Sequence, residues 1–245
     1  MEKYKKELND ADAIELLHQY NEDLLPRKFG IIGKTWTLFL FIGFLTGIYC
    51  YTNQLKQGLV ITGMRDFVFW GIYISNFVFF VAISLVGSLI TAILYLLRIS
   101  WRAPITRLSE VIAVAAITFA GLIIIVDMGR PDRMVNMILH GRIQSPIIWD
   151  VMVVATYMML SILLLYFPLL PGIAFCRDRL NGIPKWQKRM YSFLSLGWKN
   201  SPEQYKIVKK AITILSITII PVALCIHTVT SWLFASTYRP GWDST

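Results

Sequence analysis

The acidic, imidazole and phenol side chains that could exchange protons with a bound molecule lie within or at the edges of long apolar runs. Asp127 ends one run, and Asp150 lies one turn into the next. Tyr157 follows Asp150 by seven residues, which places it two turns deeper on the same helix face. His227 lies near the end of the last run. An ionisable group is costly inside a membrane, so each of these is a candidate functional residue.

A second polar set surrounds the same ends of the runs. It consists of Asp66, Asn76, Arg130, His140 and Trp149. We expect both sets to meet at one depth and to bind a polar head group with exchangeable protons. A quinone fits, because its two oxygens gain or lose two protons with two electrons, while its ring and tail suit an apolar lining. In this site Asp150 and His227 exchange protons, Tyr157 donates a hydrogen bond to the quinone, and Asp127 joins the second set in lining it.

Structural roles are the alternative for single residues. In this alternative, Arg130 and Asp132 do no more than pair with each other and shape the Gly-Arg-Pro loop. Asp150 can neutralise Arg142 or Arg133, and His227 can serve as a hydrogen bond between helices. We favour a site, because several such groups reach the same depth.

Glu110 lies at the opposite end of the run that Asp127 closes, and the two are in register on one helix face. Together they are candidates for a proton path. A simple ion pair of Glu110 with Arg102 or Arg107 is the alternative that we favour.

The elements that position these residues must be membrane-spanning helices. Hydrophobic residues make up 56% of the 245 residues and charged residues 16%, against about 25% in soluble domains. This composition excludes a disordered chain, a nucleic-acid-binding arm and an ordinary globular enzyme. Five runs are long enough to cross a hydrocarbon core of about 30 Å, which predicts an all-α transmembrane five-helix bundle. The predicted spans are Thr35–Tyr51, Phe67–Leu97, Leu108–Met128, Ile147–Leu170 and Ile212–Leu233.

The Lys and Arg residues indicate the orientation, because they accumulate on the cytoplasmic side. Of the 24, 18 lie before the first span, between the second and third, or between the fourth and fifth. We therefore expect residues 1–33 to be a cytoplasmic or interfacial segment, 34–234 the bundle, and 235–245 an outer tail. The loop 127–146 is expected outside and the basic loop 171–210 inside. Segments Asp10–Leu25 and Pro184–Trp198 read as amphipathic helices on the cytoplasmic lipid surface.

Small and hydroxyl side chains predict where the spans pack closely. Two such faces stand out, one on the second span and one on the third. Their members are Ser84, Gly87, Ser88 and Thr91 on the second span, and Ala113, Ala116 and Ala120 on the third.

We expect no haem in this chain, because only one of its three histidines lies inside a span. That residue is His227, whereas His18 and His140 lie outside the spans. We also expect no iron–sulfur cluster in this chain, because the three cysteines are far apart and form no CxxC motif.

Seven short motifs follow one another along the chain from Leu55 onward. They are Thr62-Gly63-Met64, Trp70-Gly71-x-Tyr73, Asn76-Phe77-Val78-Phe79, Trp101-Arg102-x-Pro104-Ile105-x-Arg107, Asp127-x-Gly129-Arg130-Pro131, Ser145-Pro146-x-x-Trp149-Asp150 and Pro240-Gly241-Trp242. In this order they resemble the NrfD/PsrC-like family of membrane subunits, found in polysulfide reductase, related molybdenum oxidoreductases and alternative complex III.

The resemblance implies a quinone-reactive subunit, using menaquinone or ubiquinone, in the bacterial cytoplasmic membrane. It implies an iron–sulfur, ferredoxin-like partner on the outer face and a molybdopterin or multihaem catalytic subunit, with proton translocation in some members. It places Asp150 and the Asp127 loop in the quinone region. Family members continue with further helices after Pro-Gly-Trp, so the chain is expected to correspond to their N-terminal half.

Two other functions are compatible with the same residues. A proton channel or transporter would use Glu110, Asn76 and Asp127 as its path. A purely structural membrane anchor would need only the packing faces and the uneven distribution of positive charge.

Overall fold

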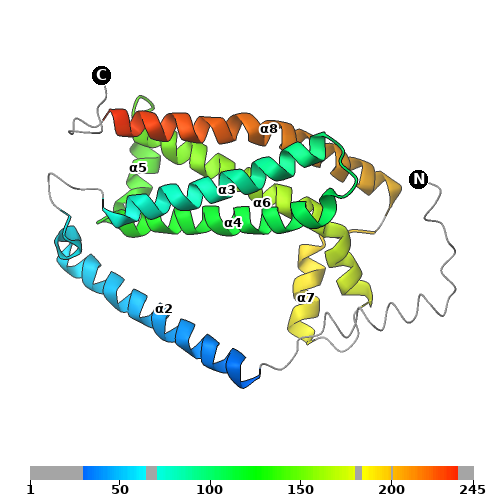
Figure 1. Ribbon diagram of the computed structural model, residues 1–245, viewed down its shortest axis with the longest axis horizontal. Coiled ribbons are helices and arrows are strands. Elements are labelled where there is room, and N and C mark those ends of the chain that lie inside the picture. Colours follow the sequence, from blue (N-terminus) through cyan, green and yellow to red (C-terminus); the bar gives the residue numbers. More distant parts are fainter. Residues whose placement is uncertain (1–29, 65–70, 180–183, 200, 237–245) are drawn as a thin grey trace. The chain divides into compact units, whose positions relative to one another are not determined.

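The computed structural model describes residues 30–64, 71–179, 184–199 and 201–236, and regular structure within these ranges is helical (Figure 1). Five helices are long and apolar enough to cross a membrane. They are α2 (Ile31–Gln57), α3 (Ile72–Leu96), α4 (Arg102–Asp127), α6 (Pro146–Arg179) and α8 (Pro202–Ala235). The chain is therefore a multi-pass integral membrane protein with an all-α fold, as the composition predicts.

Four shorter elements connect the long helices. They are η1 (Leu59–Thr62), η2 (Pro131–Arg133), α5 (Met134–His140) and α7 (Lys185–Leu194). The chain divides into two compact units. One comprises Phe44–Pro168 with Tyr205–Thr245, and the other comprises Met1–Gly43 with Leu169–Gln204. We call the first the bundle unit and describe each unit by itself.

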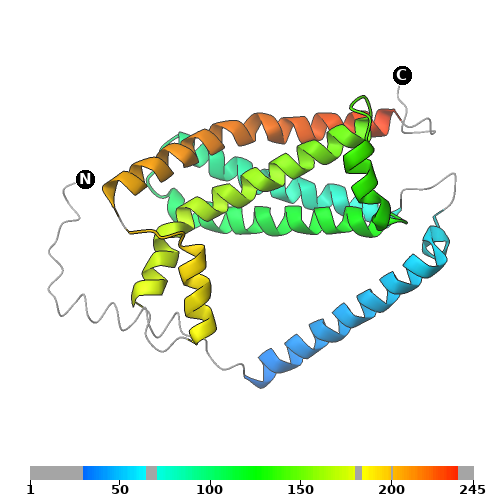
Figure 2. The same cartoon turned by 180° about the vertical axis from the view of Figure 1, so that it is seen from behind.

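The bundle unit is built on α3, α4 and the parts of α6 and α8 that belong to it, which lie side by side, while α5 runs across them (Figure 2). Its core is apolar, and each helix contributes one buried face. The largest of its fully buried side chains are those of Leu85, Ile117, Tyr157, Leu164, Ile219 and Ile226. Periodic burial along each helix therefore follows the 3.6-residue repeat expected of packed spans.

A group of hydroxyl side chains joins three of these helices inside the core. The Oγ of Ser84 donates a hydrogen bond to the carbonyl of Ala113 (2.8 Å) and lies 3.1 Å from the Tyr157 hydroxyl. Tyr157 donates to Ser88 (2.8 Å), whose Oγ is 3.3 Å from that of Ser161. We call Ser84, Ser88, Tyr157 and Ser161 the hydroxyl cluster. Each hydroxyl of the cluster has a protein partner, which matters where no bulk water is available, whereas the buried Ser216 hydroxyl has none among the described residues.

Gly87 sets the distance between α3 and α4. A Cβ added at this position would lie 2.7 Å from the Ser109 carbonyl oxygen and 3.1 Å from the Ala113 Cβ. The two helices can approach this closely only because Gly87 has no side chain. The small-residue faces predicted from the sequence are accordingly buried: Ser84, Gly87, Ser88, Thr91, Ala113, Ala116 and Ala120.

The observed helices differ from the predicted spans mainly at the ends that adjoin the basic loop 171–210. The fourth was predicted to end at Leu170 but continues to Arg179, and the fifth was predicted to begin at Ile212 but begins at Pro202. Lys and Arg are good helix formers, so a helix continues beyond its apolar run, and Pro202 suits the first helical position. The fourth helix begins at Pro146 as predicted.

The second predicted span began at Phe67, but residues 65–70 lie outside the described ranges and α3 begins at Ile72. Of the two predicted amphipathic segments, Asp10–Leu25 also lies outside them. The other, Pro184–Trp198, contains α7, a helix with separate basic and apolar faces.

Gly87→Ala should destabilise the bundle, because the new methyl group must push backbone away from backbone. Overpacking of this kind costs roughly 1–3 kcal/mol, more than the gain in helix propensity of about 1 kcal/mol. Gly121→Ala in α4 is the matched control, since its added Cβ would meet nothing within 4 Å. Thermal unfolding in detergent should show a lower midpoint for Gly87→Ala only. Equal midpoints would show that α3 and α4 are not held at this distance.

Candidate functional site

One end of the bundle unit encloses a cavity of about 320 Å³. Helices α3, α4, α5, α6 and α8 all contribute to its wall. The lining residues are Tyr73, Ile74, Phe77, Ile123, Ile124, Asp127, Met128, Met137, Ile147, Asp150, Val151, Thr230, Leu233 and Phe234. The volume lies at the lower end of the range typical of small-molecule sites, about 300–1,000 Å³.

Two carboxylates face this cavity from different helices. Asp127 is the last residue of α4, which stops there because Met128 is extended and Pro131 follows shortly after. Asp150 lies in the first turns of α6 and is 8% exposed. The predicted convergence of acids from separate spans is therefore present for these two residues.

Asp150 has a partner on a third helix. The hydroxyl of Thr230 in α8 donates a hydrogen bond of 2.6 Å to Asp150 Oδ1. A short bond of this kind to a carboxylate is a strong interaction and fixes the side chain's orientation. Among the described residues Thr230 is the hydrogen-bond donor to Asp150, and it occupies one of the two carboxylate oxygens.

Tyr73 and Gln54 form a second polar group at this end of the bundle. The Tyr73 hydroxyl donates to Gln54 Oε1 (2.8 Å), and Gln54 Nε2 donates to the carbonyl of Val126 (2.7 Å). Gln54 is the buried residue of α2, at 3% exposed. These bonds tie the end of α2 to the start of α3 and to the last turn of α4, next to Asp127.

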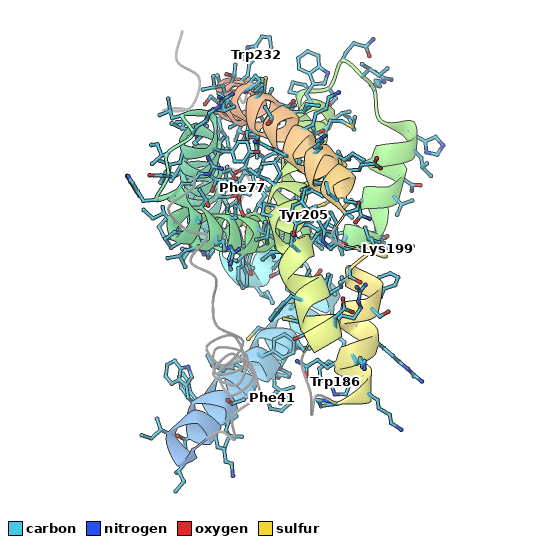
Figure 3. The ribbon with its side chains drawn as sticks, turned by 90° about the vertical axis from the view of Figure 1, so that its right-hand side faces the viewer. Phe41, Phe77, Trp186, Lys199, Tyr205 and Trp232 are labelled. Atoms are coloured by element: carbon cyan, nitrogen blue, oxygen red, sulfur yellow. The ribbon has the colours of Figure 1, made fainter. Side chains whose placement is uncertain are left out.

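Apolar side chains make up the rest of the wall. Phe77 is 3% exposed and lies among the helices of the bundle (Figure 3). Met128 and Met137 lie along the wall with it, and methionine adapts well to a flat ring. The cavity thus combines an apolar interior with two acids at one end of the membrane-spanning helices.

Three predicted residues do not line the cavity. His227 is exposed, because Ile226 takes the core face of α8 and the next residue is turned by about 100°. Asn76 is exposed for the same reason, beside buried Phe77. Tyr157 is fully buried, but in the hydroxyl cluster rather than at the cavity. The expectation that these three share a pocket with the two acids is wrong.

Arg130 and His140, the two predicted site residues that lie further along the loop, are not among the lining residues either. Arg130 contacts Asp132 at 3.4 Å, and both side chains are about two-thirds exposed. The two residues therefore form the local pair that the structural alternative predicts. An exposed pair of this kind contributes about 0–1 kcal/mol. His140 is exposed at the end of α5, and Asp66 lies outside the described residues.

Trp149 borders the site without lining it. Its indole nitrogen donates a hydrogen bond to the carbonyl of Ile143, and its ring lies 5.9 Å from that of Trp232. The contact links the start of α6 to the end of α8, the same two helices that Asp150 and Thr230 join. Trp149 therefore supports the position of Asp150.

Comparison with known proteins decides the family. Residues 60–245 match the family described as polysulphide reductase, NrfD. The chain belongs to the NrfD family. A putative membrane subunit of dimethyl sulfoxide reductase from Halobacterium salinarum is 28% identical over 209 residues, which cover 85% of this chain and 45% of the relative.

Two further relatives are more distant. A subunit of selenate reductase from Mesobacillus selenatarsenatis is 24% identical over 81% of this chain and 47% of its own length. The integral membrane subunit of menaquinone reductase from Nitratidesulfovibrio vulgaris is 27% identical over 55% of this chain and 32% of its own. The chain thus spans about half or less of the length of these relatives.

Glu110 is buried in this NrfD-family chain, at 5% exposed, far from the cavity. It shares the inner face of α4 with Ala113 and Ala120. Within the described ranges it has no ion pair, and Arg102 instead lies over the Tyr95 ring at 4.6 Å. No direct ion pair of Glu110 with Arg102 or Arg107 is formed among the described residues, although the charge of Arg107 acts on the Glu110 carboxyl group.

Thr230, Gln54 and Tyr73 were not predicted from the sequence as residues of the site. Each is a neutral polar residue, and such residues are common in transmembrane helices as packing groups. For Gln54 one signal was available, since a lone amide at the end of an apolar run needs partners for its oxygen and nitrogen.

Thr230→Val should destabilise the bundle, because it removes the donor to a buried carboxylate oxygen while keeping the side chain's shape. An unsatisfied buried group costs about 1–3 kcal/mol. Thr228→Val is the control, since the Thr228 hydroxyl is exposed and bonds only to its own helix at Leu224. Thermal unfolding should separate the two variants, and equal midpoints would mean that the Asp150 bond contributes nothing.

Proposed function

We propose that the chain is the quinone-reactive membrane subunit of a multi-subunit oxidoreductase, with the quinone head group bound in the cavity of Asp127 and Asp150. The observation that carries the proposal is a cavity lined by two acids, one from α4 and one from α6, and otherwise mainly by apolar side chains. A quinone ring needs that wall, and its two oxygens need nearby proton donors and acceptors. The menaquinone reductase relative supports this ligand class, with menaquinone favoured over ubiquinone.

In this proposal the chain's own residues handle protons and position. Reduction of a quinone to a quinol takes two electrons and two protons, and oxidation releases them. Asp150, oriented by Thr230, exchanges a proton with one quinone oxygen, and Asp127 serves the other side of the cavity. We assign no redox group to the chain, so the electrons pass to or from a partner.

The partner we propose is an iron–sulfur, ferredoxin-like subunit on the outer face, next to a molybdopterin or multihaem catalytic subunit. The relatives named as subunits of dimethyl sulfoxide and selenate reductases support an assembly of this type. The orientation we propose, with a cytoplasmic N-terminus in a bacterial inner membrane, rests on the 18 of 24 basic residues on one side. The loop 127–146, the tail 235–245 and the cavity then belong to the outer side, and residues 1–33 and the basic loop 171–210 to the inner side.

Asp150→Asn should abolish quinone-linked turnover of the assembled complex, because the amide cannot exchange a proton with the quinone. The size is similar, so assembly is retained. Turnover should fall by roughly 100-fold or more, as expected for loss of a general acid–base group. The measurement is quinol oxidation or quinone reduction by membranes that contain the whole complex.

Asp132→Asn is the matched control, since Asp132 is an exposed acid outside the cavity. Its turnover should equal that of the unmodified protein. Normal turnover of Asp150→Asn would remove Asp150 from the proton exchange. Normal turnover of both Asp150→Asn and Asp127→Asn, with no binding of a quinone analogue, would favour a structural anchor.

A second function, proton movement through the bundle, is favoured by one observation. Glu110 is buried. It lies on the same helix as Asp127, about 17 residues and roughly 25 Å away from it. The hydroxyl cluster lies between the two levels and includes Ser84, bonded to Ala113 one turn from Glu110. Proton transfer along these groups would connect the cavity with the opposite side.

Glu110→Gln should lower the number of protons moved per electron, because the path loses its entry group. A pH-sensitive dye inside proteoliposomes that contain the complete complex measures this number. Glu203→Gln, at the exposed start of α8, is the control. An unchanged proton count in Glu110→Gln would exclude this path.

A further inference from the structure

The unit that contains Leu169–Gln204 holds a basic surface that the quinone proposal does not use. Here the end of α6 meets α7, and a cavity of about 620 Å³ lies between them. Its lining residues are Arg177, Asp178, Lys185, Lys188, Arg189 and Ser192. Four cations and one carboxylate give this wall a formal charge of +3, so its ligand must be anionic. We call it the α7 pocket.

Arg177 holds α7 in place rather than serving as a free cation. Its guanidinium donates two hydrogen bonds to Asp178 (2.7 and 2.8 Å). It also donates to Ser195 Oγ (2.8 Å) and to the carbonyl of Trp198 (3.0 Å). Ser195 and Trp198 are both buried, so the far end of α7 is anchored to α6 through one side chain.

The cations of α7 remain open to a ligand. Lys185, Lys188 and Arg189 are exposed, and within the described part of the chain none of them forms an ion pair. Together with Ser192 they occupy positions i, i+3, i+4 and i+7, which is one face of a helix. That face presents three positive charges and a hydroxyl to the pocket.

The neighbouring face of α7 is apolar and exposed. Trp186 is 67% exposed, Met190 39% and Phe193 78%. Trp186 lies at the start of the helix (Figure 3). A short helix with one basic and one apolar face is typical of segments that lie in the membrane interface. In the chain, α7 lies between the membrane-spanning helices α6 and α8, so we expect it to lie close to the membrane interface.

We propose that the α7 pocket binds the head group of an anionic phospholipid. The phosphate lies between Lys188 and Arg189, and the acyl chains follow the Trp186 and Phe193 face. Charge complementarity selects an anionic over a zwitterionic lipid, and the adjoining apolar face selects a lipid over free phosphate. The pocket thereby ties the basic loop between α6 and α8 to the leaflet that carries anionic lipid.

The test compares two double variants of the full chain, delipidated in detergent and titrated with dioleoylphosphatidylglycerol while bound lipid is counted by native mass spectrometry. Lys188→Gln with Arg189→Gln removes two pocket charges. Lys209→Gln with Lys210→Gln removes the same charge from exposed positions on α8. The pocket variant should bind about tenfold or more weakly and the control less than twofold, because only the pocket variant loses charges that line the α7 pocket.

Thermal unfolding checks that both variants are folded, and Lys188→Arg should retain lipid binding. Equal affinities of the two double variants, or no preference for dioleoylphosphatidylglycerol over dioleoylphosphatidylcholine, would overturn the proposal. Complete competition by inorganic phosphate would make the pocket a free-anion site instead. Loss of partner-subunit assembly without loss of lipid binding would assign the face to protein docking, which also contradicts it.

Discussion

Inside a bilayer a polar side chain must find its partner in the protein, because no bulk water is available to replace it. The hydroxyl cluster follows from this constraint. Ser84, Ser88, Tyr157 and Ser161 bond to one another across α3 and α6, and Ser84 adds the carbonyl of Ala113 in α4. Since each bond crosses between helices, satisfying the hydroxyls also fixes how the helices are packed. Gly87 then allows the approach that the bonds require.

The same constraint operates at the cavity, with a different result. Asp150 is bonded to Thr230, and Tyr73 to Gln54, but each pair satisfies only part of its hydrogen-bonding capacity. Tyr73, Asp150 and Thr230 line the largely apolar cavity of about 320 Å³. A cavity with incompletely satisfied acids and an apolar wall favours a flat ligand that carries polar oxygens at its edges. The need of buried polar groups for partners thus accounts both for the packing of the core and for the chemistry of the candidate site.

Much of the fold could be predicted from the sequence, because apolar runs and small-residue faces report length and packing. The five spans, the start of α6 at Pro146 and the inward face of α4 follow from these patterns. The ends of α6 and α8 could not be predicted from hydropathy, because charged residues continue a helix into the polar layer. The number of spans and their packing faces were therefore predicted well from the chain, and helix termini poorly.

The candidate site could be predicted only in part, because depth does not determine the direction of a side chain around its helix. Asp127 and Asp150 share both depth and direction, whereas His227 and Asn76 share only depth. A rotation of one residue, about 100°, separates lining the cavity from facing away from it. Thr230 was missed for the opposite reason, since a threonine in an apolar run carries no distinctive signal until its neighbour on another helix is known.

Gln54 has a mechanical consequence. A single amide connects the first span to the tyrosine on the cavity wall and to the backbone beside Asp127. Any sliding or rotation of that end of α2 is transmitted through two short bonds to the groups that would face a ligand. The Phe44–Gln57 part of α2 is in this way mechanically coupled to the cavity wall, through one side chain.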